Sequence, residues 1–235
     1  MWSTKTHSLV SKAANTMQLP YIDRFEMIWE YEKLFLSGQI DFCPSIGERC
    51  PICGGKDCYR AMAPYWRYAI ELFPEFKKKR IPIARFLCRQ RQKTFSLLPI
   101  QLIPYFQYTV GAVVETLLLG MGCWQMGQKG FHGTLETIDP ESLVTPWLIS
   151  CWLVAVLRGL GRSHAVLRQV YGLDMLRSQE KAKGWEEVAG YFAAFGLEQK
   201  VHWRSLLTDL LCRYSRRTSQ FLFGTSSQYR SYIHP

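Results

Sequence analysis

The sequence predicts a mainly α fold with one small β hairpin, arranged as an N-terminal helix, the hairpin and a C-terminal helical domain. Apolar residues recur at helical spacing in Ile22–Leu36 and again through most of the chain after Tyr108. Only Ile81–Cys88 and Lys93–Leu98 are typical of strands, and the polar turn between them predicts a hairpin. We therefore expect three parts, namely an arm and helix over 1–40, a hairpin domain over 41–106 and a helical domain over 107–235.

The N-terminal helix is expected over Ile22–Leu36, because its apolar residues would share one face and Gly38 follows as a helix end. The other face is acidic and carries Asp23, Glu26, Glu30 and Glu32. Two interpretations of this face stay open. It is either solvated or docked on the basic segment that follows in the sequence.

The C-terminal domain is expected to contain helices at 108–121, 141–158, 163–172, 185–195 and 202–214. Glycines such as Gly159–Gly161 are interpreted as turns between these helices. Gly127–Pro140 is interpreted either as a long loop or as the place where a helix-turn-helix is stretched. We also consider the domain as a degenerate helix-turn-helix with Pro140–Leu157 as its second helix. The Trp, Leu, Ile and Val residues of that segment favour a core or subunit-contact helix instead.

Composition and charge narrow the class of partner. The chain has 235 residues, and its net charge of +10 makes a polyanion the expected partner, nucleic acid before an anionic membrane. The apolar run Ser142–Leu157 is shorter than the roughly 20 residues that a membrane span requires, so we expect no membrane association. Met1–Gln18 lacks the apolar core of a signal peptide, which predicts a reducing, cytoplasmic location.

Half of the eight cysteines gather around a C-x-x-C turn, Cys50 and Cys53, which is followed by two glycines. Two thiolates at this spacing converge on one tetrahedral Zn²⁺, and Cys88 lies at the predicted hairpin turn as a third ligand. A zinc ribbon would carry its fourth cysteine at position 91, which is arginine. Cys58 is our first choice for the fourth ligand and Cys43 the second. The alternative is a decayed ribbon whose cysteines pack without metal.

Four segments of the chain carry a resemblance to a known family: Cys50–Gly55, Ile83–Cys88, Lys93–Pro99 and Leu102–Tyr105. Over about residues 43–110 the chain resembles an uncharacterised zinc-ribbon domain family of bacterial mobile-element and transposase-like proteins. That family is marked by two C-x-x-C pairs and a T-F-S-L-L-P sequence, and Arg91 departs from its pattern. The resemblance implies zinc binding and DNA binding linked to transposition. The predicted fold thus becomes mainly α with a small β zinc ribbon.

The segment from 77 to 93 is strongly basic, with eight cations and no acidic residue: Lys77, Lys78, Lys79, Arg80, Arg85, Arg89, Arg91 and Lys93. Such a run can neutralise phosphates, and the aromatic residues Tyr65, Trp66 and Tyr68 could stack on unpaired bases. Arg213, Arg216 and Arg217 form a second candidate phosphate contact, although arginines also favour a helix C-terminus. DNA is the expected partner, with RNA as a second candidate, and a merely solvated basic surface is the alternative.

No catalytic constellation is recognisable. The acidic residues of the second half lie in expected helices or loops, without the strand framework of a two-metal nuclease, and the five histidines are isolated. Two hypotheses follow for the function. The chain is either a zinc-dependent DNA-binding accessory or regulatory protein of a mobile element, or a scaffold subunit of a larger transposition or nuclease complex.

Overall fold

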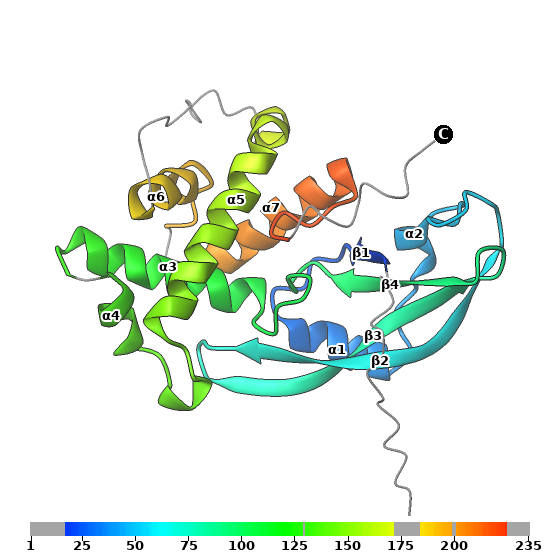
Figure 1. Cartoon of the computed structure of the whole chain (residues 1–235), viewed down its shortest axis with the longest axis horizontal. Helices are drawn as coiled ribbons and strands as arrows, with labels where there is room; N and C mark the ends of the chain where they lie inside the picture. Colours follow the sequence, from blue (N-terminus) through cyan, green and yellow to red (C-terminus); the bar gives the residue numbers. More distant parts are fainter. Residues whose placement is uncertain (1–16, 129, 172–183, 199–200, 225–235) are drawn as a thin grey trace, which may run out of the picture.

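The structure is a computed structural model that describes residues 17–128, 130–171, 184–198 and 201–224. A four-stranded sheet lies at one end of the molecule and a group of helices at the other (Figure 1). The elements in chain order are β1 (Met17–Tyr21), α1 (Ile28–Leu36), α2 (Cys43–Ile46), β2 (Tyr59–Glu71), β3 (Lys77–Cys88), β4 (Lys93–Pro99), α3 (Val110–Gln125), α4 (Gly130–Leu135), the 3₁₀ turn η1 (Pro140–Ser142), α5 (Pro146–Tyr171), α6 (Trp185–Ala194) and α7 (Trp203–Thr218).

The prediction of a mainly α fold with a small ribbon is wrong, because the sheet is a large mixed one. Its strand order is β1-β4-β3-β2, with β1 parallel to β4 and the other neighbours antiparallel. β2 and β3 are 13 and 12 residues long, more than twice the length of an average strand. β2 escaped prediction because Pro64 interrupts it. The structure tolerates this proline at the irregular register between Met62 and Tyr65, on a strand at the sheet edge.

The predicted hairpin is confirmed, although its first strand is longer than expected. β3 and β4 pair from Ala84↔Leu97 to Cys88↔Lys93, with residues 89–92 as the turn. Gln92 adopts a positive φ of 50° within this turn. β3 extends back to Lys77, where Glu71 of β2 is its partner, so the whole basic run from 77 to 80 belongs to the sheet.

α1 packs on the sheet and begins six residues later than predicted. Ile28 and Tyr31 are fully buried. Glu32 forms an ion pair with Lys79 of β3 at 2.8 Å, and the Lys77 ammonium lies 4.7 Å from the ring centre of Trp29. Of the predicted acidic face, only Glu32 docks on the basic segment, whereas Glu26 and Glu30 are exposed to solvent.

The helices of the helical end follow the predicted order, but two of the predicted helices form one continuous helix in the structure. α3, α6 and α7 correspond to the segments expected at 108–121, 185–195 and 202–214, and α4 lies within the expected loop. α5 is a single helix of 26 residues that runs through Gly159–Gly161. Gly159 is a close-packing residue here, because a Cβ at this position would lie 2.6 Å from the carbonyl oxygen of Leu222. In the described part of the chain, no helix combines the length and apolarity that a membrane span requires.

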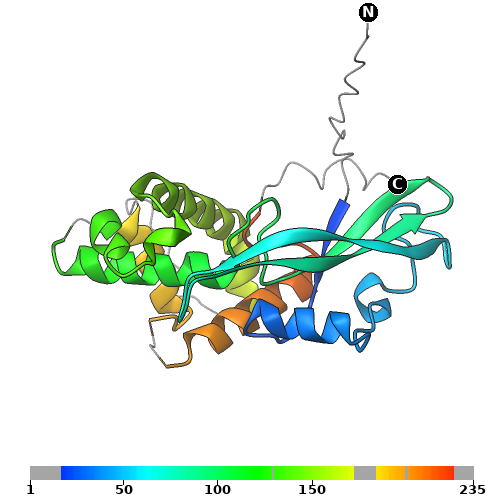
Figure 2. The same cartoon turned by 90° about the horizontal axis from the view of Figure 1, so that it is seen from below.

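Two apolar cores meet between the sheet and the helices. One is built by α3, α5, α6 and α7 around Trp152 and Phe192, and the other lies between α1, the sheet and the segment around Cys50. The Arg204 guanidinium of α7 connects the helices to the sheet: it lies 2.6 Å from the Glu115 carboxylate of α3 and 3.9 Å from that of Glu71 in β2. Figure 2 shows that the helical end meets the sheet on the side of the sheet where α1 lies.

Candidate metal centre

Four cysteines meet at the end of the sheet where β3 turns into β4, far from the group of helices α3 to α7 (Figure 1). Cys50 and Cys53 come from the turn after α2, Cys58 directly precedes β2, and Cys88 is the last residue of β3. The antiparallel register places Tyr59 opposite Cys88, which brings the neighbouring Cys58 to Cys88. The long β2–β3 pairing therefore supplies half of the site and the glycine-rich turn supplies the other half. We call Cys50, Cys53, Cys58 and Cys88 the cysteine cluster.

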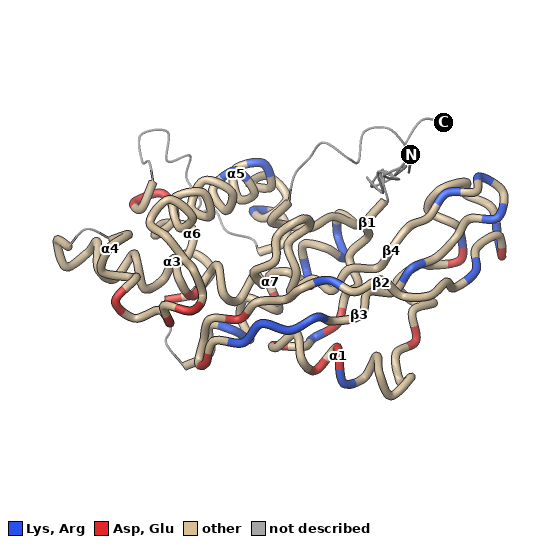
Figure 3. The backbone as a smooth tube through the Cα atoms, turned by 60° about the horizontal axis from the view of Figure 1, so that its bottom comes forward, with Lys and Arg blue, Asp and Glu red and all other residues tan. Residues whose placement is uncertain are grey.

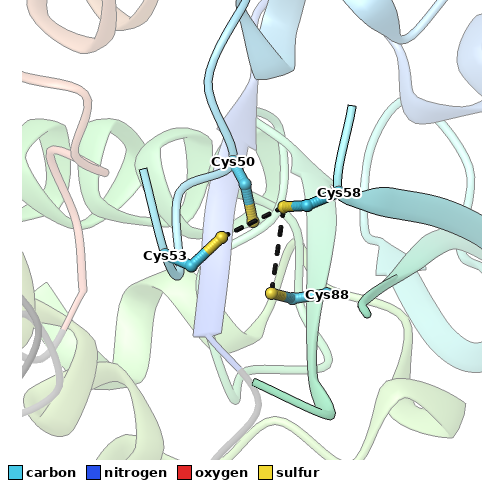
Figure 4. A group of neighbouring side chains, drawn as sticks. All are labelled: Cys50, Cys53, Cys58 and Cys88. Atoms are coloured by element: carbon cyan, nitrogen blue, oxygen red, sulfur yellow. Dashed lines mark hydrogen bonds between the residues drawn. The ribbon is translucent and has the colours of Figure 1, made fainter. Parts of the chain in front are cut away.

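The geometry of the cysteine cluster suits a single metal ion. All four Sγ atoms lie within 4.8 Å of one another, with Cys53 and Cys58 3.1 Å apart and Cys58 and Cys88 4.0 Å apart (Figure 4). Four thiolates on one tetrahedral zinc, with Zn–S near 2.3 Å, would have sulfurs about 3.8 Å apart. Cys50, Cys58 and Cys88 are buried, and Cys53 is partly exposed. The cluster could therefore hold a metal ion after shifts of about an ångström or less.

Backbone hydrogen bonds stabilise each half of the cluster. The Cys50 N–H donates to the Gly55 carbonyl at 2.9 Å, and the Arg89 N–H donates to the Cys58 carbonyl at 2.7 Å. The Arg91 N–H lies 3.4 Å from Cys88 Sγ, where it can donate to a thiolate. Such N–H donors orient sulfur ligands and stabilise their negative charge. Gly54, at φ +72°, provides the backbone conformation that this turn requires.

The thiols of the cluster differ in acidity. The hydrogen bond from Cys58 and the backbone near Gly55 lower the pKa of Cys53 to about 7. Burial raises the pKa of Cys58, and the neighbouring thiols raise it further. Burial also raises the pKa of Cys50. A divalent cation would favour ionisation of the thiols, because a cysteine ligates metal as the thiolate.

The structure brings together the three cysteines that the sequence selected and the first choice for the fourth. Cys43, the second choice for the fourth ligand, is exposed at the start of α2 and lies outside the cluster. Arg91 takes the position of the missing ribbon cysteine, and it contributes a backbone N–H while its side chain is exposed. Among the described residues, no second group of three or more such ligand atoms comes together.

The predicted nucleic-acid-binding residues fall into separate groups along the molecule. Lys77, Lys78, Lys79 and Arg80 are exposed at one end of β3, whereas Arg89, Arg91 and Lys93 are exposed at the other end beside the cysteine cluster (Figure 3). A strand of 12 residues separates these ends by roughly 36 Å, given 3.3 Å per residue. Arg85, between them, is half-buried. On α7, Arg216 and Arg217 are exposed, and Arg213 forms an ion pair with Asp209 at 2.7 Å.

Sequence reasoning missed the charged contact between the sheet and the helices. Glu71 is 2% exposed, and burial, assisted by the nearby Glu115, raises the pKa of its carboxyl to about 7. The Arg204 guanidinium opposes this rise and also donates to the Phe73 carbonyl at 3.1 Å. These residues are far apart in sequence, so no local pattern could reveal the contact. Sequence reasoning selected the aromatic residues Tyr65, Trp66 and Tyr68 but did not predict the strand β2 that carries them.

Comparison of the chain with protein-family models, with curated proteins and with solved structures finds no match. The cysteine cluster and the charged surfaces are therefore interpreted from the physical chemistry of this chain.

Proposed function

We propose that this chain is a zinc-stabilised nucleic-acid-binding protein whose partner is DNA. The observation that carries the proposal is a pair of exposed cationic groups, one at the start of β3 and one at the β3–β4 turn next to Cys88 of the cysteine cluster. In this proposal the metal fixes the end of the sheet, and the cations contact phosphates. An accessory or regulatory role in a mobile element rests on the resemblance at the cysteine and T-F-S-L-L-P motifs alone.

The donor set supports zinc in a structural role. Four thiolates in a closed tetrahedron are typical of structural zinc, whereas a catalytic zinc keeps one position open for water or substrate. The turn between α2 and β2 is rich in glycine and has few apolar side chains to bury. A bound metal supplies the stability that such a segment lacks.

The charge distribution supports a polyanionic partner. Arg89, Arg91 and Lys93 follow one another at the β3–β4 turn, where the chain reverses direction and the side chains are exposed. Exposed arginines bind phosphate oxygens in bidentate contacts, and each contact releases counterions from the nucleic acid. The affinity should therefore decrease steeply with salt.

The test is a titration of purified, zinc-loaded protein with DNA at two ionic strengths. Arg91→Ala should keep the zinc and the unfolding temperature of the parent and lower the slope of log affinity against log salt by about one. Arg158→Ala on α5, which removes an exposed arginine outside the hairpin, is the matched control and should leave the slope unchanged. Affinity that does not change with salt, or absence of zinc by elemental analysis, would contradict the proposal.

A scaffold role is the second candidate, and it is favoured by exposed apolar residues on the helical end. Leu143 and Trp147 are 79% and 74% exposed, and Val154 lies further along α5 at 43%. Apolar side chains of this size on a surface are common in protein contacts. This role would be supported over nucleic-acid binding if the chain associates with a protein partner, if that association does not weaken with salt, and if Trp147→Ala abolishes it.

A further inference from the structure

Two large aromatic side chains are exposed on the edge strand of the sheet. Trp66 and Tyr68 lie two residues apart on β2 and are 45% and 43% exposed, whereas Tyr65 is half-buried. Residues two apart on a strand point to the same side, about 6.6 Å from one another. Trp66 and Tyr68, which we call the stacking pair, therefore present two neighbouring rings on one side of β2.

The side of the sheet that bears the stacking pair is the one that α1 leaves uncovered at this point. Lys79 pairs with Ala69 in the register and forms its ion pair with Glu32 of α1. Because side chains alternate along a strand, Tyr68 and its register partner Arg80 point to the opposite side. Within the described residues, Trp66 makes no ring–ring or cation–π contact.

Two cations lie next to Tyr68 of the stacking pair. The Lys78 ammonium lies 5.1 Å and the Arg80 guanidinium 6.0 Å from the ring centre of Tyr68. In the described part of the chain neither cation forms an ion pair. Glu75, in the turn that joins β2 to β3, is the exposed carboxylate nearest to them in the sequence. The stacking pair thus combines exposed aromatic surface with two cations that contact the Tyr68 ring and have no carboxylate partner among the residues that the structure describes.

We infer that the stacking pair is a platform on which two neighbouring bases of single-stranded DNA stack, with Lys78 and Arg80 contacting the flanking phosphates. The inference deepens the proposed nucleic-acid function and rests on it. Unpaired bases offer their faces to aromatic rings, whereas the bases of a duplex are stacked on one another. A spacing of two residues on a strand suits neighbouring bases of an extended strand. The cations favour a polyanion over an uncharged protein surface.

The experiment compares binding of a fluorescently labelled oligo-dT with binding of a random duplex of equal length. Trp66→Ala and Tyr68→Ala should each weaken oligo-dT binding roughly 5- to 100-fold, the range that loss of one stacked base produces. Duplex binding should change less than about 2-fold. Trp147→Ala, which removes a more exposed tryptophan on α5, is the matched control and should bind oligo-dT as the parent does.

Zinc content and thermal unfolding of each variant must match the parent, and Trp66→Phe, which keeps a ring, should retain most of the affinity. Oligo-dT binding that is unchanged in both alanine variants would overturn the platform while leaving the nucleic-acid proposal intact. Tighter binding of oligo-U than of oligo-dT would overturn the assignment to DNA. Absence of binding to every oligonucleotide would overturn the proposed function itself and the platform with it.

Discussion

The sheet end and the helical end of this molecule stabilise their cores in different ways. The helical core is built from large apolar side chains on α3, α5, α6 and α7, and Trp152, Val156 and Phe192 are almost fully buried there. The core of the sheet contains aromatic contacts such as Phe86 on Phe95, and toward its far end it passes into the cysteine cluster. Burial of apolar surface stabilises one end, whereas a metal would stabilise the tip of the other. The two ends should therefore respond differently to the same treatment.

The largest expected effect comes from loss of a cluster cysteine. Cys88→Ser should abolish stoichiometric zinc binding and lower the unfolding temperature of the sheet end, because structural zinc contributes of the order of 10 kcal/mol in small domains. The helices should remain folded in circular dichroism. Elemental analysis and thermal unfolding give the measurements.

Two serine variants outside the cluster serve as controls for that prediction. Cys43→Ser removes an exposed thiol close in sequence to the cluster, and Cys123→Ser removes a partly exposed thiol on α3. Both should retain zinc. Retention of zinc by Cys88→Ser would show that a different set of ligands holds the metal.

The contact between the two ends should give the second-largest effect. Arg204→Met leaves the Glu71 and Glu115 carboxylates facing each other without their guanidinium, and removing one partner of a buried ion pair costs about 3 kcal/mol. Urea unfolding measures this loss. Arg213→Met on the same helix removes an exposed ion pair with Asp209 and should leave the unfolding midpoint unchanged. Equal midpoints for the two variants would mean that Arg204 does not join the two ends.

The pH dependence of stability offers a sharper test of the same contact. Burial raises the pKa of Glu71 from 4.5 to about 7, so between these values the folded chain keeps a proton that the unfolded chain releases. Stability should therefore decrease as pH rises through this window and level off above it. Glu71→Gln should remove about 1–3 kcal/mol of this dependence, since one pKa unit corresponds to about 1.4 kcal/mol. Part of the slope should remain, because burial also raises the pKa of Glu115. A slope identical to the parent's would contradict the assignment.

The smallest expected effect is that of the ion pair between α1 and β3. Lys79 is half exposed, and solvent screens its attraction to Glu32, so Lys79→Ala should cost less than about 1 kcal/mol. Denaturant unfolding provides the value. A loss as large as that of Arg204→Met would show that α1 depends on this contact more than on the burial of Ile28 and Tyr31.

Local features of the sequence predicted the parts of the fold that depend on neighbours along the chain. The β3–β4 hairpin follows from two strand-forming runs and a polar turn, and α3, α6 and α7 follow from apolar residues at helical spacing. β2 was missed because its pairing with β3 outweighs the local effect of Pro64. The predicted break in α5 was wrong because Gly159 serves a distant contact with Leu222. Pairing with the next strand overrode the local tendency at Pro64, and contact with a distant segment overrode it at Gly159.

By itself, the sequence determined the chemistry that is available. It contains a C-x-x-C turn at Cys50 and Cys53, a third cysteine at Cys88, a basic run from 77 to 93 and a predicted hairpin that overlaps this run. Tertiary structure alone decided that Cys58 completes the cluster, that α1 covers one side of the basic run and that Trp66 and Tyr68 stay exposed on the other. The physical reason is that residue type and local spacing fix which groups can bind a metal or a phosphate. Strand register and packing between distant segments fix which of those groups meet and which remain at the surface.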